Sequence, residues 1–367
     1  MIFGERVKQA RQLRTLTQTE LAKRLSTSQS TIAHIENERL SPSRELLEAI
    51  AFQTGFPPSF FRQPPEEDMP LGSLIFRARA SASSQAETTG YRYTQIGYRM
   101  IRSLLAKTKP IAVRLALLDD EDPSTAAKLT RSNLGLPPDR PIGTLVNALE
   151  RAGVVIFSLP IPLPKIDAFS MWAEEGLPMI ILANTSNQDG SRLRFSVAHE
   201  VAHLVLHRTL GGDFKEIESE ANRFAGEFLL PEAAFREEVF PPVTLSALAR
   251  QKVRWRVSLQ ALVMRAYELE IITQRQRKYL FQQLSAKGWR RREPRNLDAP
   301  VEHPQTLSHL AELHYGKPID YRRLAAHTNL RSRFVEEFIN AQHDINNVVQ
   351  ATEPATPNED APPRVFA

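Results

Sequence analysis

Two histidines four residues apart in one apolar stretch constrain this chain more than any other feature. The stretch is residues 194–207, RFSVAHEVAHLVLH, and it contains His199, Glu200 and His203. On a helix, positions i and i+4 share one face, so the two imidazoles lie close together. That separation suits two ligands of one tetrahedral zinc ion, and the intervening glutamate can act as general base towards water. The stretch therefore predicts a buried helix that carries a zinc site.

The absence of cysteine limits the ligands that such a site can use. None of the 367 residues is Cys, which excludes a disulfide framework, Cys-ligated zinc and thiol catalysis. A metal site in this chain must use His, Asp and Glu. Because two histidines are already placed on one helix, a carboxylate from a neighbouring element is expected as the third ligand.

Three glutamates near the start of a second predicted helix compete to be the third ligand. The helix is expected over residues 216–231, EIESEANRFAGEFLLP. The residues three, four and seven positions after Glu218 are Ala, Asn and Ala, and small side chains permit close approach of two helices. Glu220 instead shares its face with Phe and Glu. We expect Glu218 to be the ligand, with Glu220 as the alternative and Glu216 in solvent.

Two further polar residues belong to the same pattern. Asn222 is expected to hydrogen-bond a ligand. His207 continues the histidine spacing to i+8, but three such positions spread over about 12 Å along a helix axis, which is too far for one ion to bridge. His207 is therefore expected to support the site rather than to bind the metal.

Residues 17–43 predict two short helices joined by a turn. Thr17 and Glu20 form a capping box that starts the first helix, and residues 26–28 form the turn. The next helix begins near Gln29, with apolar residues facing inward at helical spacing. This is the helix-turn-helix arrangement, in which the second helix offers its N-terminal and outward residues to the major groove of DNA.

The outward positions of this segment carry residue types that contact DNA. Gln can pair with adenine through two hydrogen bonds, Ser and His are more permissive readers, and Arg holds phosphates. An interaction module for another protein is the alternative. We expect the DNA contacts to come from Gln18, Gln29, Ser30, His34, Arg39 and Arg44, with Arg11 and Asn37 as further phosphate candidates.

Two resemblances follow from these motifs. The TQxxLA, SxSxxI and IEN pattern closely resembles the phage repressor/Cro family of helix-turn-helix domains over about residues 5–60, except that Glu38 stands where the family usually has Gly. That resemblance implies binding to double-stranded DNA as a homodimer. Residues 140–235, with IDAFSMW, the histidine helix and ExEANRFAGEFLLP in the family's order, resemble the ImmA/IrrE zinc metallopeptidases.

The second resemblance implies a zincin-like domain and a role for each residue of the site. It implies Zn²⁺ bound by His199, His203 and Glu218, with Glu200 as the base. Family members act on helix-turn-helix repressors, and in one branch a repressor-like domain precedes the peptidase domain. Residues 166–185 are expected to form an antiparallel strand pair beside the helix that carries the two histidines.

The chain is expected to have an α+β fold in several segments. Changes in composition along the chain predict five segments. They are a helical bundle that is testable as the fragment 1–65, a proline-rich linker, a domain with three short strands before the helix of the two histidines, a helical region with a basic tether at 288–295, and a disordered tail. The expected limits of these segments are 1–62, 63–70, 71–240, 241–349 and 350–367.

Charge and hydropathy limit the partners and the location expected for the protein, but they do not indicate its activity. The net charge of +5 permits an anionic partner, and the longest apolar runs are far shorter than the ~20 residues that span a bilayer. A cytoplasmic protein without a membrane partner is expected. The sequence predicts a DNA-binding regulator with a working zinc peptidase. The alternatives are a regulator whose peptidase-like domain senses a metal or ligand without turnover, and an antitoxin-type regulator with a structural zinc.

Overall fold

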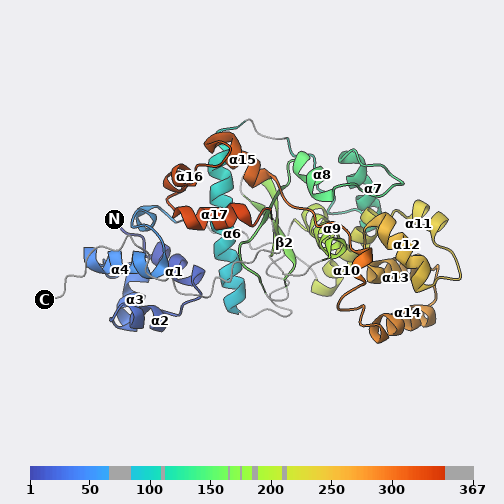
Figure 1. Ribbon diagram of the computed structural model, residues 1–367, viewed down its shortest axis with the longest axis horizontal. Helices are drawn as coiled ribbons and strands as arrows, with labels where there is room; N and C mark the ends of the chain where they lie inside the picture. The colour runs from blue at the N-terminus through green and yellow to red at the C-terminus, as the bar shows by residue number, and fades with distance from the viewer. Residues whose placement is uncertain are drawn as a thin grey trace.

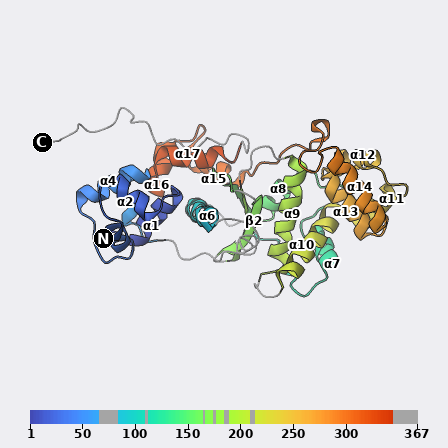
Figure 2. The same cartoon turned by 90° about the horizontal axis from the view of Figure 1, so that it is seen from below.

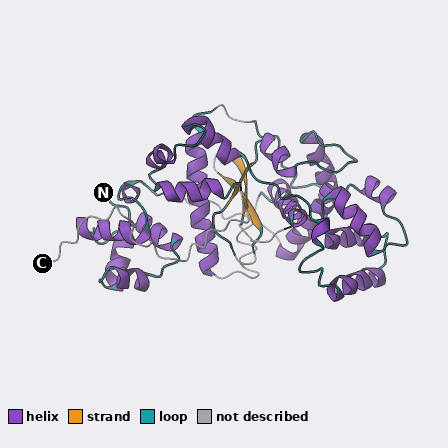
Figure 3. Ribbon diagram, viewed as in Figure 1, coloured by secondary structure: helices purple, strands orange, loops and turns teal. Residues whose placement is uncertain are grey.

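The computed structural model describes residues 1–65, 84–108, 112–163, 166–173, 176–183, 189–208 and 213–343 (Figure 1). Most of the expected linker and the whole of the expected tail lie outside the described residues. Among the described residues helices dominate, and the strands form one small sheet near the middle of the molecule (Figure 3). This confirms the α+β expectation. In the described residues between 84 and 135, α6 (Ser84–Leu105) and α7 (Pro123–Asn133) are separated by a non-helical stretch at 112–122.

The N-terminal helices follow the expected caps and turn. In α2, the Thr17 side chain accepts from the backbone N–H of Glu20, and the Glu20 carboxylate accepts from the backbone N–H of Thr17, so the capping box is confirmed. The next helix starts after Ser28, whose hydroxyl accepts from the Thr31 N–H at 3.1 Å. The elements of this bundle are α1 (Gly4–Leu13), α2 (Gln18–Arg24), α3 (Gln29–Glu36), α4 (Arg44–Thr54) and η1 (Phe60–Arg62).

The sheet has three strands in the order β1-β3-β2. β2 (Ala168–Ala173) runs antiparallel to β3 (Leu177–Leu182), as expected, with Ser170 opposite Ile180. β1 (Val155–Ser158) pairs parallel to β3 and follows α8 (Leu145–Arg151). Short β-branched and aromatic runs with buried residues on both faces explain why these segments are strands.

Helices cover both faces of the sheet. Ile156 and Ile180 belong to the apolar cluster that includes α9 (Gly190–Leu206), whereas Phe157, Phe169 and Ile181 belong to the cluster that includes α6. The strand β2 accordingly lies between α6 and α9 in both views (Figures 1 and 2). The sheet is thus a buried middle layer with the two histidines on the helix that covers one face.

The N-terminal bundle shares its core with helices that are distant in sequence. The Phe56 ring lies 5.4 Å from the ring of Phe334 on α17 (Ser332–Asn340), and Tyr93 of α6 stacks on Phe334 at 5.8 Å. Glu5 forms an ion pair with Arg92 of α6. The apolar stripes of residues 1–62 are therefore completed by α6 and α17. The two helices before α17 are α15 (Thr306–Tyr315) and α16 (Tyr321–Thr328).

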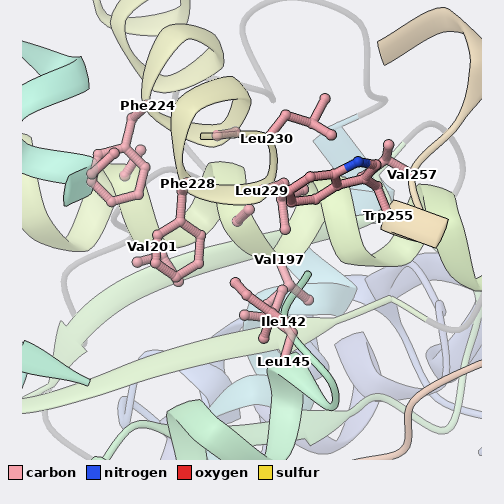
Figure 4. Close-up of a cluster of buried hydrophobic side chains, with 14 of the residues drawn as sticks. Ile142, Leu145, Val197, Val201, Phe224, Phe228, Leu229, Leu230, Trp255 and Val257 are labelled. Carbon is pink, nitrogen blue, oxygen red and sulfur yellow. The ribbon is translucent and has the colours of Figure 1, made fainter. Parts of the chain in front are cut away.

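A second group of helices packs on the other side of α9. Phe224 and Phe228 of α10 lie over Val197 and Val201 of α9, and Trp255 extends the same cluster (Figure 4). The helices of this group are α10 (Phe214–Leu229), α11 (Glu232–Glu238), α12 (Leu245–Trp255), α13 (Leu259–Glu268) and α14 (Gln274–Ala286), followed by η3 (Arg295–Leu297).

The stretch 288–295 is anchored rather than a free basic tether. Glu293 within it is buried, and its carboxylate lies 2.9 Å from Nζ of the fully buried Lys252. Lys252 also forms an ion pair with Asp189, the N-cap residue of α9. A buried ammonium ion needs such partners, and the resulting group ties α12 and the 288–295 stretch to the start of α9.

Candidate metal centre and candidate nucleic-acid interface

Two packed helices bring the expected ligands together. His199 and His203 lie one turn apart on α9, and Glu218 lies on the first half of α10. Ala221 and Ala225 of α10 are fully buried. Their small side chains let α10 approach α9. This agrees with the expectation that Glu218, which shares their face of the helix, is the ligand rather than Glu216 or Glu220.

Nε2 of His199, Nε2 of His203 and the Glu218 carboxylate lie close together and form the ligand triangle. The two Nε2 atoms are 3.1 Å apart; that of His199 lies 3.4 Å from Oε2 of Glu218, and that of His203 lies 3.4 Å from Oε1. Ligands about 2.0–2.1 Å from a tetrahedral zinc ion would be about 3.3 Å from one another. One ligand atom from each of the three residues, an imidazole nitrogen or a carboxylate oxygen, lies within 4.8 Å of the other two. This donor set and spacing therefore fit a zinc ion.

The orientation of His199 is set by Asn222. The Asn222 amide nitrogen donates to the backbone carbonyl of Glu218 at 2.7 Å, so its Oδ1 faces Nδ1 of His199 at 3.2 Å. Since Oδ1 can only accept, His199 carries its proton on Nδ1 and directs the lone pair of Nε2 towards the other two ligands. The expected supporting role of Asn222 is in agreement with this contact.

The other two candidates from the sequence form a separate pair. Nε2 of His207 lies 2.9 Å from Oε2 of Glu220, and Nδ1 of His207 lies 3.2 Å from Nδ1 of His203. Glu220 therefore lies against His207 rather than with the three ligand atoms, and Glu216 is exposed. Burial lowers the pKa of His207 below its usual value, against the opposing effect of Glu220.

Electrostatics keep the Glu218 carboxylate charged. Burial by itself would raise the pKa of Glu218, but without a metal the His199 and His203 imidazoles, when protonated, lower it far below its usual range through hydrogen bonds and their positive charge. The side chain is one-quarter exposed, at 26%, whereas those of His199 and His203 are 6% and 5% exposed. The site thus combines a charged carboxylate with two buried imidazoles, and it meets solvent on the Glu218 side.

Glu200 points from α9 towards the sheet. Its side chain has no solvent exposure, and Oε2 accepts a hydrogen bond from the Ser170 hydroxyl on β2 at 2.8 Å. Trp172, two residues along β2, donates from its indole nitrogen to the carbonyl of Leu204 at 2.9 Å, which joins the strand to the same helix. Sequence reasoning missed Ser170. A small polar residue inside the apolar run AFSMW was the available signal.

The candidate DNA-reading residues lie on an exposed part of α2 and α3. Nε2 of Gln29 donates to Oε1 of Gln18 at 2.6 Å, and Nε2 of Gln18 donates to Oε2 of Glu36 at 2.8 Å. This chain of hydrogen bonds fixes the Gln18 amide, while Gln29 keeps its own carbonyl oxygen and its second N–H available. Ser30 and His34 are exposed on the same helix.

The arginines near α3 divide into exposed and buried ones. Arg39 is exposed, and so is Arg44, which lies 3.0 Å from Glu48 one turn along α4. Arg11 is not available for phosphates, contrary to expectation. Its guanidinium is buried, contacts both carboxylate oxygens of Glu36 at 2.6 and 2.9 Å, and donates to the carbonyl of Leu16.

The position at which the repressor/Cro family usually has Gly keeps a left-handed backbone. Glu38 has φ +58°, a conformation that disfavours most side chains. Its carboxylate accepts from the backbone N–H of Gly4 at 3.1 Å, at the start of α1. This contact satisfies one of the free N–H groups of that helix end, which offsets part of the strain.

Two family models match this chain, one over the N-terminal bundle and one over the candidate metal centre. Residues 7–61 match the family model described as helix-turn-helix, and residues 149–267 match the model described as IrrE N-terminal-like domain. The chain therefore joins a helix-turn-helix region to an IrrE-like region. Both resemblances expected from the sequence are confirmed. The IrrE-like match contains α9, α10 and the three strands of the sheet.

A curated relative supports the N-terminal assignment. The immunity repressor protein of Bacillus phage phi105 is 44% identical over 55 residues, which cover 15% of this chain and 38% of the repressor. The chain thus matches well under half of that relative's length. In the described part of the chain, no helix has the length and apolarity needed to cross a membrane.

Proposed function

We propose that this protein is a DNA-binding transcriptional regulator whose IrrE-like region is a zinc-dependent peptidase. The observation that carries the proposal is the convergence of Nε2 of His199, Nε2 of His203 and the Glu218 carboxylate within about one zinc coordination sphere. The family match adds that such a site is expected in this region, and Glu200 supplies the general base of the motif.

The residues of the site divide the work of peptide hydrolysis. His199, His203 and Glu218 would hold the zinc ion, which would supply Lewis-acid activation of water and of the scissile carbonyl. Glu200 would take the proton from the attacking water as the C–O bond forms, and would pass it to the leaving amine when the C–N bond then breaks. Ser170 holds the Glu200 carboxylate from the sheet side, and Asn222 holds the His199 ring.

The DNA-binding part of the proposal rests on Gln29. An adenine edge needs one acceptor and one donor from a glutamine side chain, and Gln29 keeps both while Gln18 braces it. Ser30 and His34 flank it on α3, and Arg39 and Arg44 are placed to hold phosphates. The phage repressor relative and the helix-turn-helix match support DNA as the partner, bound by a homodimer.

The proposed substrate is another helix-turn-helix repressor. The ImmA/IrrE resemblance implies this class of protein, and cleavage of such a repressor would relieve repression in a stress or mobile-element response. A regulator that senses a metal or a ligand without turnover is the second candidate. The complete burial of Glu200 favours it, because a buried carboxylate can serve structure as well as catalysis.

The deciding experiment compares the wild type with Glu200→Gln, which keeps the hydrogen bond from Ser170 but removes the basic carboxylate. Zinc content, DNA binding and cleavage of a purified repressor-class protein are measured for both. The peptidase proposal expects equal zinc and DNA binding, with cleavage only by the wild type. Cleavage by both proteins contradicts the role of Glu200. Zinc binding without cleavage by either supports the sensor.

A further inference from the structure

A chain of contacts leads away from one metal ligand. Nδ1 of His203 lies 3.2 Å from Nδ1 of His207, and Nε2 of His207 lies 2.9 Å from Oε2 of Glu220. The His203 and His207 side chains are buried, whereas Glu220 is partly exposed at the surface end of the chain. None of these contacts uses Nε2 of His203, which faces Glu218 and His199.

When both imidazoles are neutral, only one arrangement of protons makes both contacts of the chain hydrogen bonds. An ionised carboxylate can only accept, so His207 must carry its proton on Nε2. Nδ1 of His207 is then an acceptor, and a hydrogen bond to it requires a proton on Nδ1 of His203. The proton of His203 is thereby placed on the nitrogen that points away from the ligand triangle, and the lone pair of Nε2 points into it.

We propose that Glu220 and His207 form a positioning pair that fixes the tautomer and the ring orientation of His203 for metal binding. The inference rests on the metal site of the proposed function, but it does not depend on peptide cleavage. It assigns roles to two residues that are not metal ligands. His207 cannot be a ligand in this arrangement, because both of its ring nitrogens already have partners outside the triangle.

The two ligand histidines are held in different ways. His199 is fixed by the neutral amide of Asn222, whose own orientation is set by the backbone carbonyl of Glu218. His203 is fixed through an imidazole by a carboxylate. An acceptor chain that ends on a negative charge raises the basicity of the ligand nitrogen more than a neutral amide does. Loss of His207 should therefore weaken the metal site through His203 alone.

The test measures zinc affinity by competition with a chelator, using the full chain. His207→Ala and Glu220→Ala should each weaken zinc binding by about 10–100-fold, the range for removing a partner that orients a ligand. Glu220→Gln keeps an acceptor for His207 but not the negative charge, and should recover part of the affinity lost in Glu220→Ala. Glu216→Ala is the matched control, because it removes an exposed carboxylate from the same helix without touching the pair.

A second readout follows the proton itself. In zinc-free protein at about pH 8, where a histidine with an ordinary pKa is neutral, ¹H–¹⁵N correlation spectra of the imidazoles distinguish the two tautomers. The His203 signal is identified by its loss in His203→Gln. Wild type and Glu220→Gln should show His203 protonated on Nδ1, and His207→Ala should show a mixture.

The outcomes separate this inference from the proposed function. Unchanged zinc affinity in both alanine variants, or His203 protonated on Nδ1 in His207→Ala as in the wild type, overturns the positioning pair. If His207→Ala does not fold, Glu220→Ala carries the same test at the exposed end of the chain. A wild type that binds zinc but cleaves nothing removes the peptidase proposal and leaves the positioning pair standing. A wild type that binds no zinc contradicts both.

Discussion

Ser170 Oγ donates a hydrogen bond across 2.8 Å to Oε2 of Glu200, and the two side chains belong to different layers of the fold. Ser170 lies on β2 in the buried sheet, and Glu200 lies on the helix that also carries both histidines. The sheet therefore sets the direction of the Glu200 carboxylate. The helix α9 sets its position relative to His199 and His203.

Replacing Ser170 by Ala should lower cleavage without removing the metal. The hydrogen bond to a charged group is worth about 1.5–3 kcal/mol, which corresponds to roughly a 10–150-fold loss in kcat/KM if the contact persists in the transition state. Zinc content should equal that of the wild type, because no ligand contacts Ser170 through this bond. Unchanged cleavage in a zinc-loaded variant would show that the carboxylate is held adequately without the hydroxyl.

Removing Glu218 should abolish most zinc binding, as should His199→Ala or His203→Ala. Each change leaves two ligands where a tetrahedral site needs three from the protein. About one zinc ion per chain is expected in the wild type, measured by elemental analysis after dialysis. Glu220→Ala should still load at excess zinc despite its lower affinity. Loss of zinc in Glu220→Ala at excess metal, with retention in Glu218→Ala, would reverse the assignment.

Gln29→Ala should relax the DNA sequence preference of the full chain. A good side-chain pair with a base is worth about 1–3 kcal/mol, so affinity for the selected site should fall by roughly 5- to 150-fold, with little change on random DNA. Arg44→Ala should instead weaken binding to all sequences and lower the salt dependence. Selection from random DNA should return a pseudo-palindrome. Recovery of no preferred sequence would favour a protein-binding role for this region.

The shared core predicts that the helix-turn-helix region depends on α17 for stability. Phe334 is buried against Phe56 and Tyr93, so Phe334→Ala should lower the free energy of unfolding by about 3–5 kcal/mol. Leu313→Ala, at a residue 69% exposed, is the control and should change stability little. For the same reason, the fragment 1–65 should be less stable than this region is within the full chain. Equal thermal stability of the two would contradict this view.

Acid should weaken the attachment of α12 to α9. Burial tends to raise the pKa of Asp189, but hydrogen bonds from Lys252 and Ser191 lower it below its usual value. A lowered pKa contributes stability above the ordinary value near 4, and this contribution is lost as the pH falls through the folded-state value. Asp189→Asn should cost about 3–5 kcal/mol at pH 7 and show a shallower acid dependence in denaturant titrations. If Asp189→Asn lost stability at low pH as steeply as the wild type does, the role of the Asp189 carboxylate would be contradicted.

The sequence by itself determined the local features of this protein. The capping box at Thr17, the turn before Gln29 and the four-residue spacing of His199 and His203 are short-range patterns, and short-range geometry of helices and turns is set by neighbouring residues. The choice of Glu218 also followed from helical periodicity, because small neighbours mark the face on which two helices can approach.

Only the tertiary structure decided which distant residues meet. Ser170 reaches Glu200 because β2 packs against α9, Arg11 turns inward because Glu36 lies opposite it, and Phe334 completes a core begun nearly 280 residues earlier. No periodicity encodes such contacts, since they depend on how separate elements pack. The chain of His203, His207 and Glu220 shows the same division: the helix spacing brought the two histidines together, and the packing of α10 supplied the carboxylate.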